Sequence, residues 1–252
     1  GKLRLKVGKV EPKSEFFAPE NARNHLGFST ERSPTIIAQG PPSMSINAFI
    51  KPNDNFEIAF GIYDASWNQG RDENTFKLHN FFDTSDYAMF LEGRFTWDNG
   101  PNGLPGGLKV GAWRLDGNKT KFNGDVVDGT NGFYVTYDQT LTQTGIGVYA
   151  QYGYADEEVS PLGRHVGAGF QWKGAIESRE NDVFGAGFSN VKFSDVEGSP
   201  FIKGSETAYE IFYKATVTEY FLVQADLQYI VNPGGGLAED VLVPTFRATL
   251  RF

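Results

Sequence analysis

Charged side chains recur at every second position in several stretches of the sequence, with apolar side chains between them. In the stretch YAMFLEGRFTW, Glu92 and Arg94 alternate with Leu91 and Phe95. A period of two places the charges on one face of a β-strand and the apolar side chains on the other. The same parity assigns these residues to the polar face: Arg4, Lys6, Glu57, Glu92, Arg94, Lys109, Glu210, Lys214, Asp226, Arg247 and Arg251.

A polar face with charges of both signs suits the lining of an aqueous pore. Mixed charge orders the water across a pore and favours neutral polyols over ions of one sign. The alternative is that these side chains are solvated wall residues, whose cross-strand pairs fix the register of the strands. The sequence leaves both roles open for each of the residues.

Two aromatic residues share this polar face. In GLKVGAW, Trp113 falls on the same side as Lys109, and in GVYAQYG, Tyr149 falls on the same side as Gln151. The face of an indole or phenol ring can stack on the apolar C–H face of a pyranose, and its polar atom can bond a hydroxyl. The sequence therefore suggests sugar stacking at both rings, with an aromatic residue at the membrane interface as the alternative.

A long connection, residues 11–42, separates the first two strand-like stretches. It contains FFAPENARNHLGFSTERSP, which combines aromatic, amide and charged side chains. Connections of this length within one domain usually have a function or are disordered. We expect this segment either to fold into the pore as a constriction or to cover it from outside. Its candidate constriction residues are Asn21, Arg23, Asn24, His25 and Arg32.

Other kinds of chemistry have little support in the sequence. His25, His79 and His165 are all expected in loops or at strand ends, without a metal-ligand spacing such as H-E-x-x-H. RDENTF, residues 71–76, lacks the EF-hand pattern. We find no Ser–His pair that a lipase would need, and no basic patch for nucleic acid in a chain of net charge −8. We expect no enzyme activity, no metal, no cofactor and no nucleic-acid partner.

Strands must position the candidate residues, because helical periodicity is nearly absent. About twelve alternating stretches follow one another, each of roughly 8–12 residues, which is longer than most soluble strands and close to what a tilted strand needs to cross a bilayer. The 30 Gly and 22 Phe fit strands joined by turns. No apolar run approaches the ~20 residues of a membrane-spanning helix.

Long and short connections mostly alternate along the chain. One stretch that we predict to be a long loop is DGNKTKFNGDVVDGTN, residues 116–131. Every short turn falls on the same side as the terminal Phe252, and membrane barrels likewise have short periplasmic turns and long outer loops. The pattern predicts an all-β fold, an antiparallel transmembrane β-barrel with apolar side chains facing lipid and polar side chains lining the lumen.

The last stretch, PTFRATLRF, shows the same division of faces. Phe246, Ala248, Leu250 and Phe252 fall on one side, opposite the arginines. In a closed barrel these four would face lipid, with Phe252 in the aromatic belt at the interface. An ordinary half-buried strand at the end of a soluble β-sandwich is the alternative.

Several stretches resemble a known family. They are GFYVTYDQTL, ETAYEIFYKATVTEYFLVQADLQYIVNPGGG and FRATLRF, and the most specific piece is QADLQYI at 224–230 followed by NPGG at 232–235. These resemble the carbohydrate-selective outer-membrane porins, the OprB-like group, although Ala225 stands where the family usually has Pro. The resemblance implies a barrel of about sixteen strands in the Gram-negative outer membrane, through which sugars diffuse passively.

The resemblance also sets expectations about partners and completeness. It implies outer-membrane lipids and lipopolysaccharide around the barrel, sugars as solutes, and a C-terminal Phe252 that resembles the signal read by the barrel-assembly machinery. We expect residues 1–252 to be one barrel domain that lacks its first strands, with a natural twelve-stranded barrel as the alternative. A general porin and a soluble or surface β-sandwich that binds glycans are the rival functions, and monomer or oligomer is left open.

Overall fold

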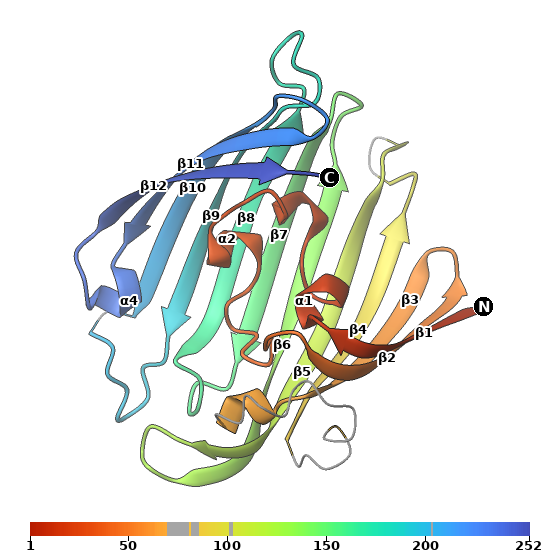
Figure 1. The fold of residues 1–252 in the computed structure, drawn as a ribbon. Helices are drawn as coiled ribbons and strands as arrows, with labels where there is room; N and C mark the ends of the chain where they lie inside the picture. The colour runs from red at the N-terminus through yellow and green to blue at the C-terminus, as the bar shows by residue number, and fades with distance from the viewer. Residues whose placement is uncertain (70–80, 82–85, 101–102, 203) are drawn as a thin grey trace.

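In the part of the chain that the structure describes, twelve strands form one antiparallel sheet, in which every strand lies beside its neighbours in the chain. The computed structural model describes residues 1–69, 81, 86–100, 103–202 and 204–252. The strands (Figure 1) are β1 (Lys2–Val10), β2 (Ser43–Asn53), β3 (Phe56–Asp64), β4 (Tyr87–Trp97), β5 (Gly106–Thr120), β6 (Val126–Thr140), β7 (Ile146–Ala155), β8 (Leu162–Lys173), β9 (Val183–Phe193), β10 (Ser205–Thr216), β11 (Phe221–Val231) and β12 (Val241–Leu250).

Single helical turns lie between some of the strands. These turns are α1 (Pro12–Glu15), η1 (Glu20–Ala22), α2 (Phe28–Glu31), η2 (Ser66–Gln69) and α4 (Pro233–Gly236). Within the described part of the chain, no helix has the length and apolar character needed to cross a membrane. The sequence-based prediction of an all-β chain with about twelve antiparallel strands is confirmed.

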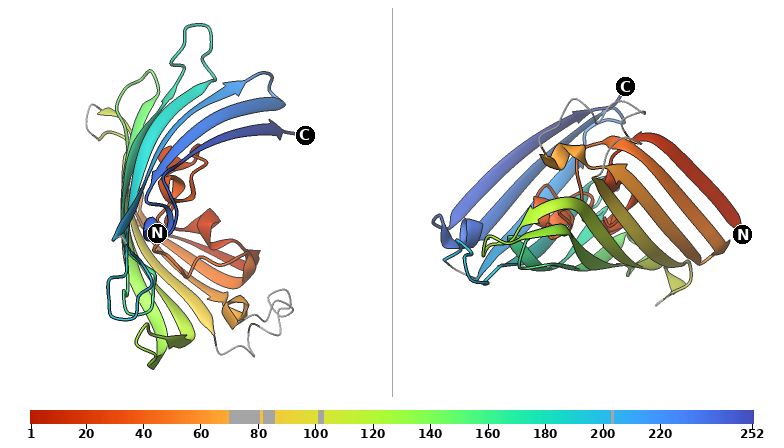
Figure 2. Two further views of the ribbon diagram at one scale, coloured as in Figure 1. Left: turned by 90° about the vertical axis from the view of Figure 1, so that its left-hand side faces the viewer. Right: turned by 90° about the horizontal axis from the view of Figure 1, so that it is seen from below.

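The sheet is strongly curved, so that it has a concave and a convex face. Figure 2 shows the strands wrapping around the N-terminal connection, with β1 and β12 on opposite arms of the curve. Strand order runs without interruption from β1 to β12, and each pair of neighbours is antiparallel. A curved meander of this kind gives every strand one inward and one outward row of side chains.

The two faces differ in polarity in the way that the alternation predicts. On β4, Leu91 and Phe95 point to the convex face and are 55% and 49% exposed, whereas Glu92 on the concave face is 0% exposed. Other apolar side chains left exposed on outward positions are Leu3, Leu5, Val7, Ile50, Ile58, Phe60, Val110, Phe133, Val166, Ile211, Phe246 and Leu250. A soluble protein rarely exposes so extended an apolar surface.

One predicted loop is instead a tall hairpin. Within residues 116–131, Asn118 pairs with Asp128 and Thr120 with Val126, so that β5 and β6 continue as paired strands and a short turn joins them. The register shifts between Leu115 and Asn118, beside Gly117, which has a positive φ of 90°. The loop prediction was wrong because Gly, Asn and Asp favour turns locally, while pairing across the hairpin outweighs that preference.

The connection between β1 and β2, residues 11–42, lies against the concave face, and we call it the inner segment. In Figures 1 and 2 it carries α1, η1 and α2 across the inside of the curve. Its two ends are adjacent, because Val10 and Ser43 are register partners. The segment therefore leaves the wall, crosses the concave side and returns to the same edge of the sheet.

Candidate pore constriction

Aromatic side chains attach the start of the inner segment to the wall. The ring of Phe16 stacks on Phe90 with centroids 5.3 Å apart, and that of Phe17 meets Tyr134 edge-on at 5.9 Å. Both segment residues are buried in one hydrophobic cluster with the inner side of β2 to β6. Gly61 on β3 makes room for Phe16, because a Cβ there would lie 2.8 Å from its ring. Apolar burial and ring contacts thus fix this end of the segment.

The backbone of Phe17 is bent so that its amide reaches the wall. Phe17 has a φ of 53°, which is uncommon for a residue with a side chain. Its N–H donates to Oε2 of Glu92 at 2.9 Å. Since such a conformation persists only where the surroundings hold it, the flanking contacts of Phe16 and Phe17 stabilise the turn.

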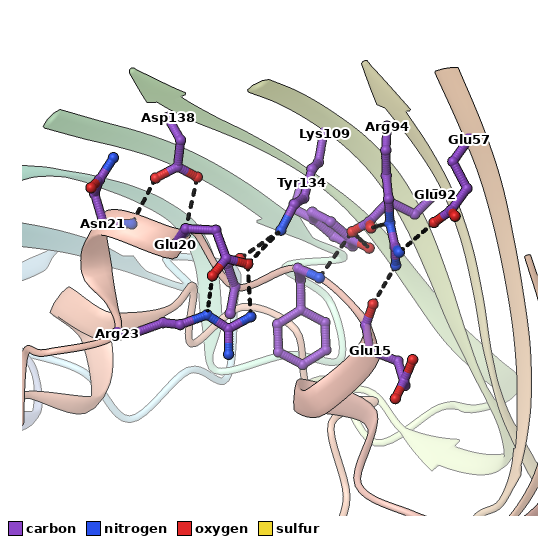
Figure 3. Close-up of polar contacts among 12 residues, drawn as sticks. Glu15, Glu20, Asn21, Arg23, Glu57, Glu92, Arg94, Lys109, Tyr134 and Asp138 are labelled. Atoms are coloured by element: carbon purple, nitrogen blue, oxygen red, sulfur yellow. Dashed lines mark hydrogen bonds and ion pairs between the residues drawn. The ribbon is translucent and has the colours of Figure 1, made fainter. Parts of the chain in front are cut away.

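Glu92 is the centre of the polar contacts beneath the segment (Figure 3). Besides the Phe17 amide, its Oε2 accepts the hydroxyl of Tyr134 at 2.7 Å, and its Oε1 accepts Nε of Arg94 at 2.5 Å. Three donors therefore replace the water that a buried carboxylate would need. This arrangement explains how a charged residue is tolerated inside the sheet.

Arg94 connects the wall to the inner segment. Its Nη1 donates to Oε1 of Glu57 at 2.7 Å, and its Nη2 donates to the backbone carbonyl of Glu15. Its guanidinium carbon lies 5.6 Å from the centre of the Phe16 ring. The cation is thus shared among two wall carboxylates and one segment carbonyl, and Figure 3 shows all three contacts.

Further along the segment, Asp138 on β6 accepts two successive backbone amides. The N–H of Glu20 donates to its Oδ2 at 2.9 Å and that of Asn21 to its Oδ1 at 2.8 Å (Figure 3). Beside it, Nζ of Lys109 donates to the carbonyl of Ala18 at 2.8 Å and lies 3.8 Å from a carboxylate oxygen of Glu20. The wall binds the backbone of the segment here more than its side chains.

Amide side chains hold the middle of the segment. Nε2 of Gln171 donates to Oδ1 of Asn21 at 2.9 Å, and Nδ2 of Asn24 donates to Oε1 of Gln171 at 2.6 Å. Nζ of Lys214 donates to Oδ1 of Asn24 at 2.8 Å, and Nε2 of Gln224 donates to its carbonyl at 2.8 Å. Three strands, β8, β10 and β11, thus converge on two asparagines that lie far from them in the sequence.

Glu210 on β10 binds residues 25–30 of the segment. Its Oε1 accepts the N–H of Leu26 at 2.6 Å, and its Oε2 accepts the N–H of Gly27 at 3.2 Å and the hydroxyl of Thr30. Nδ1 of His25 lies 3.4 Å from the same oxygen. His25, Gly27, Thr30 and Glu210 are buried and Leu26 is half-buried, so the carboxylate satisfies donors that water reaches poorly.

The remaining residues that we predicted on the polar face lie at the first strand and at the last two. Arg4 and Lys6 on β1 both reach Glu15 of the segment, at 3.4 and 2.6 Å. Asp226 is buried on β11, where Nε2 of Gln228 donates to it at 3.1 Å. At the last strand, Arg247 and Arg251 are exposed.

Two segment residues predicted at the constriction form local ion pairs. Arg23 binds Glu20 at 2.7 Å. Arg32 binds Glu31 at 2.5 Å, and its Nε donates to Oε1 of Gln39 at 2.7 Å. These cations are therefore held within the segment rather than by the wall.

The two aromatic residues proposed to stack on sugars are covered. Trp113 is 2% exposed within the hydrophobic cluster that includes Ile36 of the segment and Leu115. Tyr149 is equally buried, with its ring 5.4 Å from that of His25. In this arrangement neither ring presents a face to the lumen, so their positions give no support to sugar stacking.

Some important contacts were not anticipated from the sequence. Asp138 binds the backbone of the segment, and Tyr134 binds Glu92, which anchors it. Glu15 belongs to the segment and binds Lys6 on the wall. Alternation in GFYVTYDQ gives Tyr134 and Asp138 inward parity, so the same rule that selected Glu92 could have found both. Glu15 has no such signal, because it lies in a connection without regular periodicity.

No metal centre is seen among the described residues, in which no three His, Cys, Asp or Glu side chains gather to hold an ion. His165 was expected in a loop or at a strand end, but it lies within β8, where Nε2 is 3.1 Å from the hydroxyl of Ser189. His79 and the RDENTF stretch, residues 71–76, lie outside the described residues.

Comparison with known proteins places this geometry in a family. The model of the carbohydrate-selective porin family OprB matches residues 1–252, while no curated protein matches the chain in sequence. The high-pH structure of Pseudomonas putida OprB is similar with a TM-score of 0.79 at 19% identity, over 99% of this chain and 70% of that one. The low-pH structure of the same protein is similar with a TM-score of 0.62 at 17% identity, over 99% and 62%. The chain belongs to the OprB family of carbohydrate-selective porins.

Proposed function

We propose that the chain forms the wall of an outer-membrane pore in which the inner segment is the constriction and through which sugars diffuse passively. The observation that carries this proposal is the inverted polarity of the sheet. Apolar side chains are exposed on the convex face, and charged and amide side chains gather on the concave face around the segment. This is the polarity of a barrel wall between lipid and water.

The concave face offers sugars a polar surface with charges of both signs. Arg4, Lys6 and Glu57 keep part of their side chains exposed beside the segment. Glu92 and Glu210 are buried and accept hydrogen bonds from backbone amides. Hydroxyl groups of a neutral sugar can exchange bonds with water at such a surface without a large electrostatic barrier. Passive diffusion of this kind needs no cofactor and no energy source, and a porin fold provides a channel rather than a catalytic centre.

The setting of the pore follows from the same surfaces. We place the apolar convex face in the outer membrane of a Gram-negative cell, against lipid and lipopolysaccharide. Phe246, Leu250 and Phe252 are exposed along the last strand, where they would meet lipid. A terminal aromatic residue also suits recognition by the barrel-assembly machinery.

Two rival functions can be compared with the structure. A glycan-binding β-sandwich requires two sheets that face each other, whereas the twelve strands here belong to one sheet. A general porin without sugar preference has the same architecture, so transport must distinguish it from a selective one.

Liposome swelling provides that distinction. The protein is reconstituted, and swelling rates are compared in arabinose, glucose and a neutral amino acid of similar size. We expect swelling in both sugars at rates above that in the amino acid. Equal rates for all three solutes would favour the general porin, and no swelling in any solute would contradict a pore.

A further inference from the structure

We infer that Asp138 and Glu210 are positioning residues that set the width of the constriction by holding the backbone of the inner segment. This inference rests on the proposed role of the segment as the constriction. The two carboxylates project from β6 and β10, on different parts of the curved wall. Between them they bind the two ends of residues 20–27, which form the middle of the segment.

The binding geometry is the same at both carboxylates. Each uses its two oxygens for two successive backbone amides: Glu20 and Asn21 at Asp138, with N–O distances of 2.9 and 2.8 Å, and Leu26 and Gly27 at Glu210, with distances of 2.6 and 3.2 Å. At both sites, two carboxylate oxygens bind two successive backbone amides. This pairing depends on the path of the backbone and not on the side chains of the residues that donate.

The segment needs such acceptors and donors from the wall because it has little regular structure of its own. The amides of Leu26 and Gly27 lie between the single turns η1 and α2, where the described chain gives them no sheet or long-helix partner, and amides shielded from water must be paired. The amides of Glu20 and Asn21 are the first two of η1, which have no partner within that turn. An ionised carboxylate forms hydrogen bonds that are shorter and stronger than those of a neutral acceptor. Two carboxylates can therefore hold irregular backbone at a defined place in the lumen.

The wall is also shaped to receive the segment. A Cβ at Gly147 would lie 2.2 Å from Oδ1 of Asn21, and one at Gly153 would lie 2.0 Å from the hydroxyl oxygen of Ser33. A side chain at either position would collide with the side chain of Asn21 or of Ser33, which would have to move. Glycines beneath the segment and carboxylates at two points along it are consistent with a segment docked on the wall.

The test replaces each carboxylate by its amide and records single channels in planar bilayers. In Glu210→Gln, an amide nitrogen replaces one acceptor and would face backbone N–H groups. We expect a second, higher conductance level whose occupancy rises about tenfold, the change expected from loss of a charged hydrogen bond. Asp138→Asn should do the same.

Glu206→Gln is the matched control. Glu206 lies on the same strand as Glu210, and its Oε2 accepts a backbone amide too, that of Gly234 in another loop, at 2.7 Å. We expect wild-type conductance in this variant. If Glu210→Gln and Glu206→Gln give the same currents, the positioning role is wrong.

A second measurement separates this inference from the proposed function. Trypsin cleavage at Arg23 reports release of the segment whether or not sugars pass. We expect faster cleavage in Glu210→Gln than in Glu206→Gln. In both variants the folded barrel should keep the electrophoretic mobility of the folded wild type in unheated samples. If the wild-type protein passes no sugar but cleavage still rises, the proposed function fails while the positioning role stands.

Asp138→Asn covers the case in which Glu210→Gln folds poorly, because Asp138 holds the segment from a different strand, β6. Wild-type conductance together with wild-type cleavage at Arg23 in a folded Asp138→Asn variant would overturn the inference.

Discussion

A single buried carboxylate, Glu92, joins the wall of the sheet to the inner segment. It accepts hydrogen bonds from a segment amide, from Tyr134 and from Arg94, which in turn binds Glu57. Removing one member of such a group leaves its partners buried without hydrogen bonds. The resulting loss of stability is larger than the net contribution of the hydrogen bond itself.

Glu92→Ala should therefore destabilise the protein strongly. We expect the free energy of unfolding to fall by about 3–5 kcal/mol, because Arg94, Tyr134 and the Phe17 amide lose a shared partner. Tyr134→Phe should cost only about 1 kcal/mol, since Glu92 keeps its other donors. Urea unfolding in lipid, followed by tryptophan fluorescence, measures both, and equal losses would contradict the central place of Glu92.

Adjacent residues on β3 should differ in their contact with water. Glu57 points to the concave face and Ile58 to the convex face, where it is 38% exposed. In a chain without native cysteine, Glu57→Cys should react with a hydrophilic, membrane-impermeant thiol reagent in proteoliposomes, and Ile58→Cys should not. The reverse pattern would mean that the sheet faces lipid with its polar side.

At this scale, alternation predicted which way wall residues point but not what they bind. Glu92 and Arg94 lie on the concave face as expected, and Asp138 could have been found by the same rule. The contact of Glu210 with Leu26 joins residues 184 positions apart. No local pattern in the sequence encodes such a pairing, and the burial of Trp113 beneath the segment was missed for the same reason.

At the scale of elements, the inner segment depends on small residues in the wall. A Cβ at Gly61 would lie 2.8 Å from the ring of Phe16 and 2.5 Å from Oδ1 of Asn47, so a larger side chain must displace the ring. Gly93 on β4 points to the convex face, where a Cβ would be in ordinary contact with the ring of Phe56 at 3.7 Å and the carbonyl oxygen of Val110 at 3.9 Å. Glycine therefore has a packing role at one position and not at the other.

Gly61→Val should loosen the inner segment, whereas Gly93→Val should leave it in place. We expect faster trypsin cleavage at Arg23 or Arg32 in Gly61→Val, because Phe16 no longer anchors the segment. The cleavage rate of Gly93→Val should match that of the wild type. A segment equally protected in both variants would show that Phe16 is not an anchor.

Strands were predictable where apolar and polar residues alternate strictly, as in β4 and β12. The extension of β5 and β6 could not be predicted. Gly117 and Gly129, with φ of 90° and 72°, make this stretch of sequence resemble a turn. The inner segment lacks periodicity altogether, and its path depends on contacts with strands throughout the sheet. Sequence analysis accordingly proposed the segment as a constriction but could not exclude an outer cover.

At the scale of the whole molecule, the sheet is organised with its apolar side outward. Its convex face exposes apolar side chains along many strands, while its concave face binds a polar and aromatic segment. Membership of the OprB family gives this arrangement a function, the passage of carbohydrates. The central claim is that the inner segment narrows an aqueous path along the concave face.

Replacing the inner segment by a short turn tests that claim most directly. Because Val10 and Ser43 are register partners, residues 11–42 can be exchanged for a four-residue turn of about the length common in hairpins, without breaking the pairing of β1 with β2. Conductance is then measured in planar bilayers with neutral polymers of increasing size. We predict a higher conductance than that of the wild type and entry of larger polymers. Unchanged conductance and an unchanged polymer cut-off would contradict the account.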